Sequence, residues 1–271
     1  MEIKLLDQEI FTKKNAMLPF ALTDVLTETA GKTNSNLLHF WQFEQTFILG
    51  MKDTRVDHLE AGVKVLKENH YDLVIRNAGG LGVISDKGIL NISWIFPKGN
   101  TSIDQGYEKM LTLIQNAFPE LTIQANEISH SYCPGKFDLS VDGKKIAGIA
   151  QRRVKEGIAV MMYLSVSGDQ NKRGEIVQAF YQKSLTENYG KNGYPEVWPQ
   201  TMTTLSDVLD KTISISETKR RFLQALDIDE VAQNALDWIK ENKLETQIEN
   251  KLVNMTKRNK QLEELNDVPS L

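Results

Sequence analysis

SHSYCPGKFDLSVDGKKIAGIAQRR, residues 129–153, holds Cys133, the only cysteine of the chain, in a Pro-Gly turn. Two short β-type runs follow this turn, and they are joined by the hairpin signal Asp142-Gly143. Two lysines, Lys144 and Lys145, come directly after the hairpin signal. A thiol in a turn and a lysine on a nearby strand are ingredients of acyl transfer through a thioester, provided that the fold brings them together.

The two lysines are expected to differ in their surroundings. Successive side chains of a strand point to opposite faces, so only one of the two can point inward. If Lys145 faces the same side as Ala147 and Ile149, it lies on an apolar and buried face, where a lysine needs a partner. Lys144 would then be solvated, and Lys145 is the functional candidate.

Cys133 has two interpretations. A lone cysteine is more often a small buried hydrophobe than a nucleophile. The turn formers Ser131, Pro134 and Gly135 favour a loop. The positive charges of Lys136, Lys144 and Lys145, which are close in sequence, favour the thiolate. His130 is a candidate base, although a polar loop residue is the simpler interpretation, because a base must lie within hydrogen-bonding reach. From the residues alone, both interpretations of Cys133 stay open.

A second feature is the glycine-rich turn from Asn77 to Gly82, between an expected strand at residues 73–75 and a second one that starts at Val83. Dinucleotide- and phosphate-binding glycine motifs lie between a strand and a helix, as GxGxxG or as GxxxxGK followed by Ser or Thr, and neither is present. Glycines here let the backbone lie close to a ligand or to another strand. A plain tight turn and a ligand-cradling loop are both open.

The remaining pattern defines the fold class. Apolar residues at helical spacing alternate irregularly with β-type runs, and from Met202 onward the pattern is helical. Mixed elements without strict βαβ alternation predict an α+β fold, with a mixed, largely antiparallel sheet flanked by helices. We expect helices at 16–30, 55–69, 102–118 (capped by Thr101 or Ser102) and 174–189, two strands or a hairpin at 36–50, strands at 121–125 and 156–168, and a charged, solvated tail helix from 243 that frays.

Composition excludes several classes of protein. The net charge of −4 argues against general nucleic-acid binding, and one cysteine rules out an intrachain disulfide framework. No apolar run approaches the roughly 20 residues that span a bilayer. No HExxH or CxxC motif suggests a metal site. We expect a cytoplasmic protein without a metal and without membrane or nucleic-acid partners.

The segments IRNAGGLGVISDKGILNISWIF (75–96) and SYCPGKFDLSVDGKKIAGIAQRR (131–153) resemble the lipoate–protein ligase / octanoyltransferase family. The resemblance covers roughly residues 15–210 and is strongest to the lipoyl-relay amidotransferase branch, of which FILGMKDTR (47–55) is also typical. It implies an α+β catalytic domain like that of biotin protein ligases and class II aminoacyl-tRNA synthetases. We expect this acyltransferase domain over residues 1–201, with residues 202–271 as a helical C-terminal extension packed on the same domain.

The first segment matches the family pattern Arg-Arg-x-Ser/Thr-Gly-Gly in part. Arg76 matches the second arginine, and Gly79 and Gly80 match the glycines. Ile75 and Ala78 depart from the pattern at the first arginine and at the Ser/Thr position. These departures weaken the interpretation as an ATP-using ligase, whose phosphate cradle uses such polar groups.

The second segment matches the family's Lys-x-x-Gly pattern at Lys145 and Gly148. In the resembled branch the nucleophilic cysteine lies in the turn before the lysine's strand, which implies that role for Cys133. The resemblance implies that the acyl chain lies in an apolar tunnel beside the glycine-rich turn, walled by residues such as Leu81 and Val83. The acyl-binding residues that it implies are Arg76, Gly79, Gly80, Leu81, Val83 and Gly148.

The resemblance implies an octanoyl (lipoyl) amidotransferase that uses no cofactor. The acyl donor would be octanoylated glycine-cleavage H protein, and the acceptors would be lipoyl-domain lysines of 2-oxoacid dehydrogenase acyltransferase subunits. Lys145 would hold the acyl carbonyl or help to move protons. The alternatives are an octanoyltransferase that uses octanoyl-acyl carrier protein, an ATP-dependent lipoate–protein ligase, and a protein that merely binds lipoyl domains.

Overall fold

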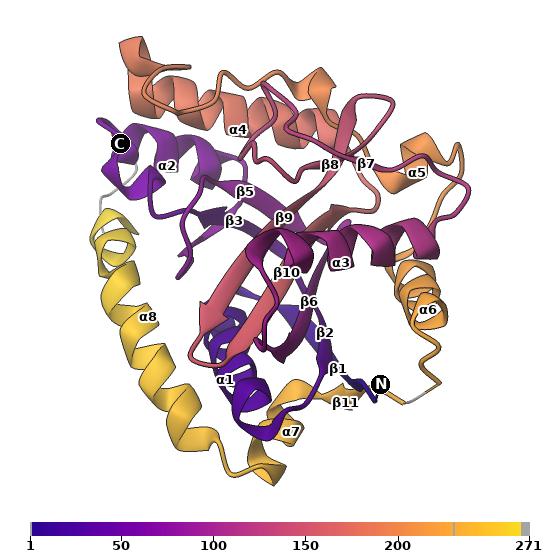
Figure 1. Ribbon diagram of the computed structural model, residues 1–271. Helices are drawn as coiled ribbons and strands as arrows, with labels where there is room; N and C mark the ends of the chain where they lie inside the picture. The colour runs from indigo at the N-terminus through magenta and orange to yellow at the C-terminus, as the bar shows by residue number, and fades with distance from the viewer. Residues whose placement is uncertain (1, 230, 267–271) are drawn as a thin grey trace.

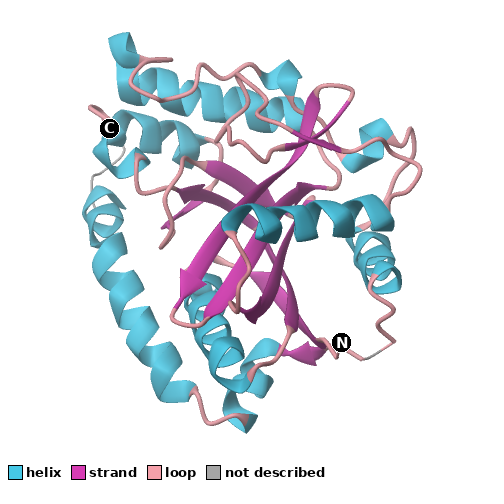
Figure 2. Ribbon diagram, viewed as in Figure 1, coloured by secondary structure: helices cyan, strands magenta, loops and turns pink. Residues whose placement is uncertain are grey.

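The computed structural model describes residues 2–229 and 231–266. An eight-stranded sheet forms its centre, and a three-stranded sheet lies beside it (Figures 1 and 2). The large sheet has the order β11-β1-β2-β6-β10-β9-β8-β7, and the small one has the order β4-β3-β5. The strands are β1 (Lys4–Phe11), β2 (Leu37–Phe43), β3 (Gln45–Leu49), β4 (Asp72–Ile75), β5 (Val83–Asp86), β6 (Ile89–Pro97), β7 (Gln124–Ala125), β8 (Leu139–Val141), β9 (Lys144–Val154), β10 (Gly157–Ser165) and β11 (Gln233–Asn234).

The pairing of the strands makes both sheets mixed. In the large sheet, β1 runs parallel to β2 and to β11, and the other neighbours are antiparallel. In the small sheet, β3 is parallel to β4 and antiparallel to β5. The predicted α+β class with a mixed, largely antiparallel sheet is therefore confirmed.

Helices cover both faces of the large sheet, and the sheet separates two hydrophobic cores. They are α1 (Leu18–Thr33), α2 (Leu59–Glu68), α3 (Ile103–Ala117), α4 (Gln170–Leu185), α5 (Leu205–Val208), α6 (Ile215–Ala225), α7 (Ala235–Glu241) and α8 (Glu245–Asn266). Residues of α3, α5 and α6 build one core, and residues of α1, α2, α4, α7, α8 and the small sheet build the other. Along β10, Val160 and Met162 belong to the first core and Ala159 to the second, which is the alternation expected of a strand buried on both faces.

The predicted strands are confirmed in part. The segment 36–50 forms two strands, one of the two expected outcomes, and these do not make a hairpin because β2 pairs within the large sheet and β3 within the small one. The strand expected at 121–125 shortens to β7, and β11 was not expected. Both β7 and β11 have two residues and lie at the edges of the large sheet, where tertiary pairing rather than local pattern defines a strand.

The C-terminal part is more closely packed than a solvated tail. After β11 adds a strand beside β1, helix α8 runs along one side of the molecule past α1 (Figure 1). One face of α8 is buried through Ile248, Met255 and Leu262. The expected solvated helix is therefore wrong for this face. The tail was expected to fray within 243–271; it is helical as far as Asn266, and 267–271 lie outside the described residues. The domain boundary at residue 201 stays a prediction.

No helix in the described ranges is both long and apolar enough to cross a bilayer.

The N-cap of α3 gives a direct test of the local structure. The Ser102 hydroxyl accepts a hydrogen bond from the Gln105 amide at 3.1 Å, and the Gln105 side chain accepts one from the Ser102 amide at 2.8 Å. We expect Ser102→Ala to lower the free energy of unfolding by about 1 kcal/mol in urea denaturation. Thr101→Ala is the control and should change it by less than about 0.5 kcal/mol. Equal losses would show that Ser102 is not the cap.

Candidate active site

Cys133 lies in the loop between β7 and β8, which is organised around one buried carboxylate. Asp138 accepts hydrogen bonds from the backbone amides of Gly135 at 3.1 Å and Ile128 at 3.4 Å. Cys133 is half-buried and has a φ of 48°, in the left-handed region that non-glycine residues seldom occupy. Such a backbone persists only where surrounding contacts hold it.

Lys145 supplies those contacts. Its Nζ donates to the carbonyl oxygens of Cys133 at 2.9 Å and Tyr132 at 3.0 Å, and to the hydroxyl of Ser131 at 3.3 Å. It also forms an ion pair with Asp138 at 2.9 Å, in which both side chains are buried. Burial raises the pKa of the Asp138 carboxyl, and the charge of Lys145 opposes this shift. The hairpin β8–β9 thus folds Lys145 back onto the cysteine turn.

Lys145 is buried and Lys144 is exposed, but not through the alternation that the sequence suggested. Leu139 pairs with Ala147 and Ser140 pairs with Lys145, so Ile146 is the extra residue of a β-bulge. The bulge turns Lys145 to the face of Gly148, whose added Cβ would lie 3.7 Å from Lys145 Nζ. The expectation that Lys145 shares a face with Ala147 is therefore wrong.

The thiol of Cys133 points to the glycine-rich loop between β4 and β5. The backbone amide of Leu81 donates to Sγ at 3.4 Å, and Arg76 Nη2 lies 3.7 Å from Sγ. A thiolate makes both interactions more strongly than a thiol does. Lys136, which was expected to supply positive charge, is 79% exposed and pairs with Asp104 at 3.8 Å. The cation beside the sulfur is therefore Arg76, which the sequence suggested for acyl binding.

Arg76 also holds the loop itself. Its guanidinium donates to the carbonyl oxygens of Gly79 at 2.9 Å and Leu81 at 3.1 Å. Gly80 has a φ of +89°, and an added Cβ would lie 2.6 Å from Arg76 Nη2 and 3.5 Å from Cys133 Sγ. On the other side of the loop, a Cβ at Gly50 would lie 2.0 Å from the Gly80 carbonyl oxygen. Two backbones therefore approach closely at this point, which only glycine allows.

A buried polar chain supports the next residue of the loop, and sequence reasoning missed it. The amide of Gly82 donates to the Tyr181 hydroxyl at 2.9 Å, and that hydroxyl donates to Asp53 at 2.8 Å. The second oxygen of Asp53 accepts from the Gly50 amide at 2.7 Å. Burial raises the pKa of Asp53 to about 6. The one signal in the sequence was that Asp53 belongs to the FILGMKDTR segment.

An ion pair between Arg152 and Asp24, which was not predicted from the sequence, lies at the start of the glycine-rich loop. Arg152 Nη1 donates to the carbonyl oxygen of Asn77 at 3.0 Å, and Arg152 Nη2 donates to Asp24 at 2.9 Å. The Asp24 carboxylate is buried on α1, so this contact links α1, β9 and the loop.

His130 does not take the position of a base. Its Nδ1 lies 3.0 Å from the carbonyl oxygen of Glu196, and its ring stacks on Trp198 with centroids 3.7 Å apart. The simpler interpretation, a polar loop residue, agrees with these contacts. Leu81 and Val83, the expected walls of an acyl tunnel, are both buried in the core that contains α1, α4 and the small sheet.

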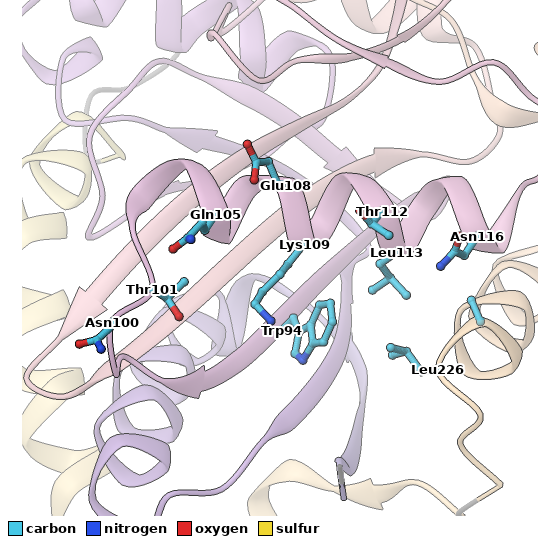
Figure 3. A pocket seen from close by; sticks show the side chains of 11 residues that line it. Trp94, Asn100, Thr101, Gln105, Glu108, Lys109, Thr112, Leu113, Asn116 and Leu226 are labelled. Atoms are coloured by element: carbon cyan, nitrogen blue, oxygen red, sulfur yellow. The ribbon is translucent and has the colours of Figure 1, made fainter.

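A hollow of about 580 Å³ lies apart from the thiol, between α3, β6 and the end of α6 (Figure 3). It is lined by 11 residues, among them Trp94, Lys109 and Leu226. None of the predicted site residues lines it, so it is not the site described above. Across residues 2–229 and 231–266, no group of three or more His, Cys, Asp or Glu side chains is arranged to hold a metal ion.

Comparison with known proteins relates this geometry to characterised families. A family model described as the lipoyl protein ligase A/B catalytic domain matches residues 15–227. The chain is 42% identical over 215 residues to an octanoyl-GcvH:protein N-octanoyltransferase of Anoxybacillus flavithermus, covering 78% of each protein. It is 39% identical over 217 residues to a lipoyl-GcvH:protein N-lipoyltransferase of Listeria monocytogenes, again covering 78% of each. The crystal structure of lipoate-protein ligase A bound with ATP has a TM-score of 0.64 at 20% identity, covering 86% of this chain and 88% of that one, which supports the fold.

The buried ion pair predicts a large difference between the two adjacent lysines. Lys145→Met leaves the Asp138 carboxylate buried without its partner, and we expect it to lower the free energy of unfolding by roughly 3 kcal/mol. Lys144→Met, the matched control on the exposed side, should change it by less than about 0.5 kcal/mol. Adding Asp138→Asn to Lys145→Met should restore part of the loss in urea denaturation. No recovery in the double variant would mean that the pair is not the cause.

Asp53 predicts a pH dependence of stability. Its pKa is raised from 3.8 to about 6 on folding, so between these values the folded state binds more protons than the unfolded state. This carboxyl therefore makes the free energy of unfolding fall as the pH rises from about 4 to about 7, by roughly 2 kcal/mol. Asp53→Asn lacks this contribution. As the pH rises from about 4 to about 7, its free energy of unfolding should therefore increase by roughly 2 kcal/mol relative to that of wild type. Asp57→Asn, at an exposed position, is the control, and its free energy of unfolding should depend on pH as that of wild type does. If Asp53→Asn also showed the wild-type pH dependence, the raised pKa of Asp53 would be contradicted.

Proposed function

The chain belongs to the lipoyl protein ligase A/B catalytic-domain family, and from this premise we propose that it is a cysteine-dependent octanoyl-GcvH:protein N-octanoyltransferase. The acyl donor in this proposal is octanoylated glycine-cleavage H protein. The acceptors are lipoyl-domain lysines of 2-oxoacid dehydrogenase acyltransferase subunits. The observation that carries the proposal is the position of Cys133 Sγ, with the Leu81 amide at 3.4 Å and the Arg76 guanidinium at 3.7 Å.

The proposed reaction has two steps on Cys133. The thiolate attacks the carbonyl carbon of octanoyl-lysine; the C–S bond forms, the C–N bond breaks, and the leaving amine takes up a proton. A neutral lysine amine of the acceptor then attacks the thioester; the new C–N bond forms, the C–S bond breaks, and the amine loses a proton. The first step is uphill because an amide becomes a thioester. The overall exchange is amide for amide and close to neutral, so the proposal needs no ATP and no cofactor.

The groups around the sulfur have separate roles in this proposal. An amide donor 3.4 Å from Sγ is near enough to donate to the oxyanion of an acyl group attached to that sulfur, which supports Leu81 as the oxyanion donor. Arg76 adds a second donor and a positive charge. Lys145 contacts the backbone carbonyl of Cys133, which supports a role in positioning the nucleophile. The expected role in moving protons is less well supported, because Lys145 could accept a proton only as a neutral amine, without its ion pair to Asp138.

The acyl chain is proposed to lie beside the glycine-rich loop, along Leu81 and Val83, where Gly79 and Gly148 carry no side chain and Gly80 lets Arg76 and the thiol approach the loop. Gly79 supports this arrangement, because a Cβ added there would meet no atom within 4 Å. At Gly148 an added Cβ would come 3.6 Å from Lys145 Cε, which is ordinary van der Waals contact. The Listeria relative is named for a lipoyl group, so lipoyl is the second acyl group whose transfer should be tested.

The ligase alternative is less well supported at the position of the family's first arginine. Ile75 occupies it and is fully buried, so it offers no polar side chain to a phosphate.

The choice of acyl donor, octanoyl-H protein or octanoyl-acyl carrier protein, can be decided by supplying each donor separately and measuring transfer. A cytoplasmic location also remains a prediction.

Mass spectrometry tests the acyl-enzyme directly. After incubation with octanoylated H protein, wild type should carry one octanoyl group on Cys133, and hydroxylamine should remove it because it is a thioester. Cys133→Ala should carry none and should lose transfer to a lipoyl domain by at least about 100-fold. Ser129→Ala, an exposed position in the same loop, is the control and should form the adduct and transfer as wild type does. Equal transfer by wild type and Cys133→Ala would overturn the mechanism.

A further inference from the structure

Asn259 of helix α8 occupies an unusual place at the edge of the small sheet. Its Oδ1 accepts a hydrogen bond from the Ile75 amide at 2.7 Å, and its Nδ2 donates to the Ile75 carbonyl oxygen at 3.1 Å. Nδ2 also donates to the Met255 carbonyl oxygen one helical turn earlier, at 2.9 Å. Asn259 is only 6% exposed. One side chain from the C-terminal helix therefore pairs with both backbone groups of a residue 184 positions away.

The geometry of β4 explains why this pairing is needed. β4 is an edge strand, bonded only to β3 within the small sheet. Arg76 donates its amide to Leu49 of β3 at 3.0 Å, and in a parallel pair the groups of the neighbouring residue then point away from that partner. The amide and carbonyl of Ile75 would be left unpaired in a buried place, at a cost in free energy. The side-chain amide of Asn259 offers an oxygen acceptor and two N–H donors. It can therefore pair with both backbone groups of Ile75, as a neighbouring strand would.

The residue that follows Ile75 carries the contact with the thiol. Arg76 is held by β3 through its amide, and its guanidinium reaches Gly79, Leu81 and Cys133 Sγ. The end of β4 is therefore fixed on both sides, by β3 on one and by Asn259 on the other. A shift of Ile75 would carry Arg76 with it and would move the loop that holds the Leu81 amide.

We propose that Asn259 is a positioning residue, through which helix α8 sets Arg76 and the glycine-rich loop against Cys133. The proposal rests on the proposed function only for its effect on transfer, because the effect on the thiol is independent of the reaction. Other contacts dock α8 on the same part of the molecule: Lys251 pairs with Glu28 of α1 at 3.8 Å, and Arg258 contacts Met51 just after Gly50. The C-terminal helix is thus part of the support of the site.

The experiment compares Asn259→Ala with Asn254→Ala, an exposed asparagine on the same helix. The rate of Cys133 alkylation by iodoacetamide and the rate of octanoyl transfer are measured on full-length protein, at a temperature where circular dichroism shows every variant folded. We expect Asn259→Ala to lower both rates by roughly tenfold and Asn254→Ala to leave them unchanged. Asn259→Asp places an acceptor oxygen of a buried carboxylate against the Ile75 and Met255 carbonyl oxygens, so its rates should be no higher than those of Asn259→Ala.

Combination with Arg76→Ala separates positioning from general loss of stability. If Asn259 acts through Arg76, Asn259→Ala should have little further effect on alkylation in the Arg76→Ala background. Additive effects, or equal rates for Asn259→Ala and wild type, would overturn the inference. If octanoyl transfer is absent in wild type, the proposed function fails, while the alkylation rates still decide the role of Asn259.

Discussion

The buried ammonium of Lys145 is the contact on which the site depends. It binds the carbonyl oxygens of two successive residues, Tyr132 and Cys133, and so holds the cysteine in a left-handed conformation. Burial of a charge is tolerated only when the charge is paired, and Asp138 provides the pairing while it also accepts two backbone amides of the same loop. The ion pair between Lys145 and Asp138 therefore pairs a buried charge and also holds the backbone of the cysteine turn. The Leu81 amide and Arg76 then contact the thiol that this turn presents to the glycine-rich loop.

The glycine-rich loop is held from several directions before any substrate binds. The close approach of Gly50 and Gly80 fixes its distance from β3, and the Asp53–Tyr181 chain fixes the Gly82 amide. Arg76 closes the loop by binding its carbonyl oxygens. Donors that are fixed in advance stabilise a developing charge without reorganisation, which is the main requirement of an oxyanion site. The buried polar residues around the loop therefore support the oxyanion role that is proposed for it.

The same fold supports ligases and transferases, so the chemistry has to be argued from the site. The crystal structure of lipoate-protein ligase A is similar in fold at only 20% identity. In this chain the position of the family's first arginine is a fully buried isoleucine whose backbone is paired by Asn259. A cysteine beside an arginine and a backbone amide is suited to covalent acyl transfer, and this difference underlies the proposed function.

The fold class and most helices and strands could be predicted from the amino-acid sequence, because apolar periodicity and turn signals are local properties. The two segments of the candidate site were recognised from their turns and from the family resemblance. The sequence also identified Cys133, Lys145 and Arg76 as the residues to examine. The β-bulge at Ile146, the Asp53–Tyr181 chain and the pairing of Asn259 with Ile75 were decided only by the tertiary structure. Each depends on groups far apart in the sequence whose hydrogen bonds must be satisfied in the buried interior, and no local pattern records which partner will be near.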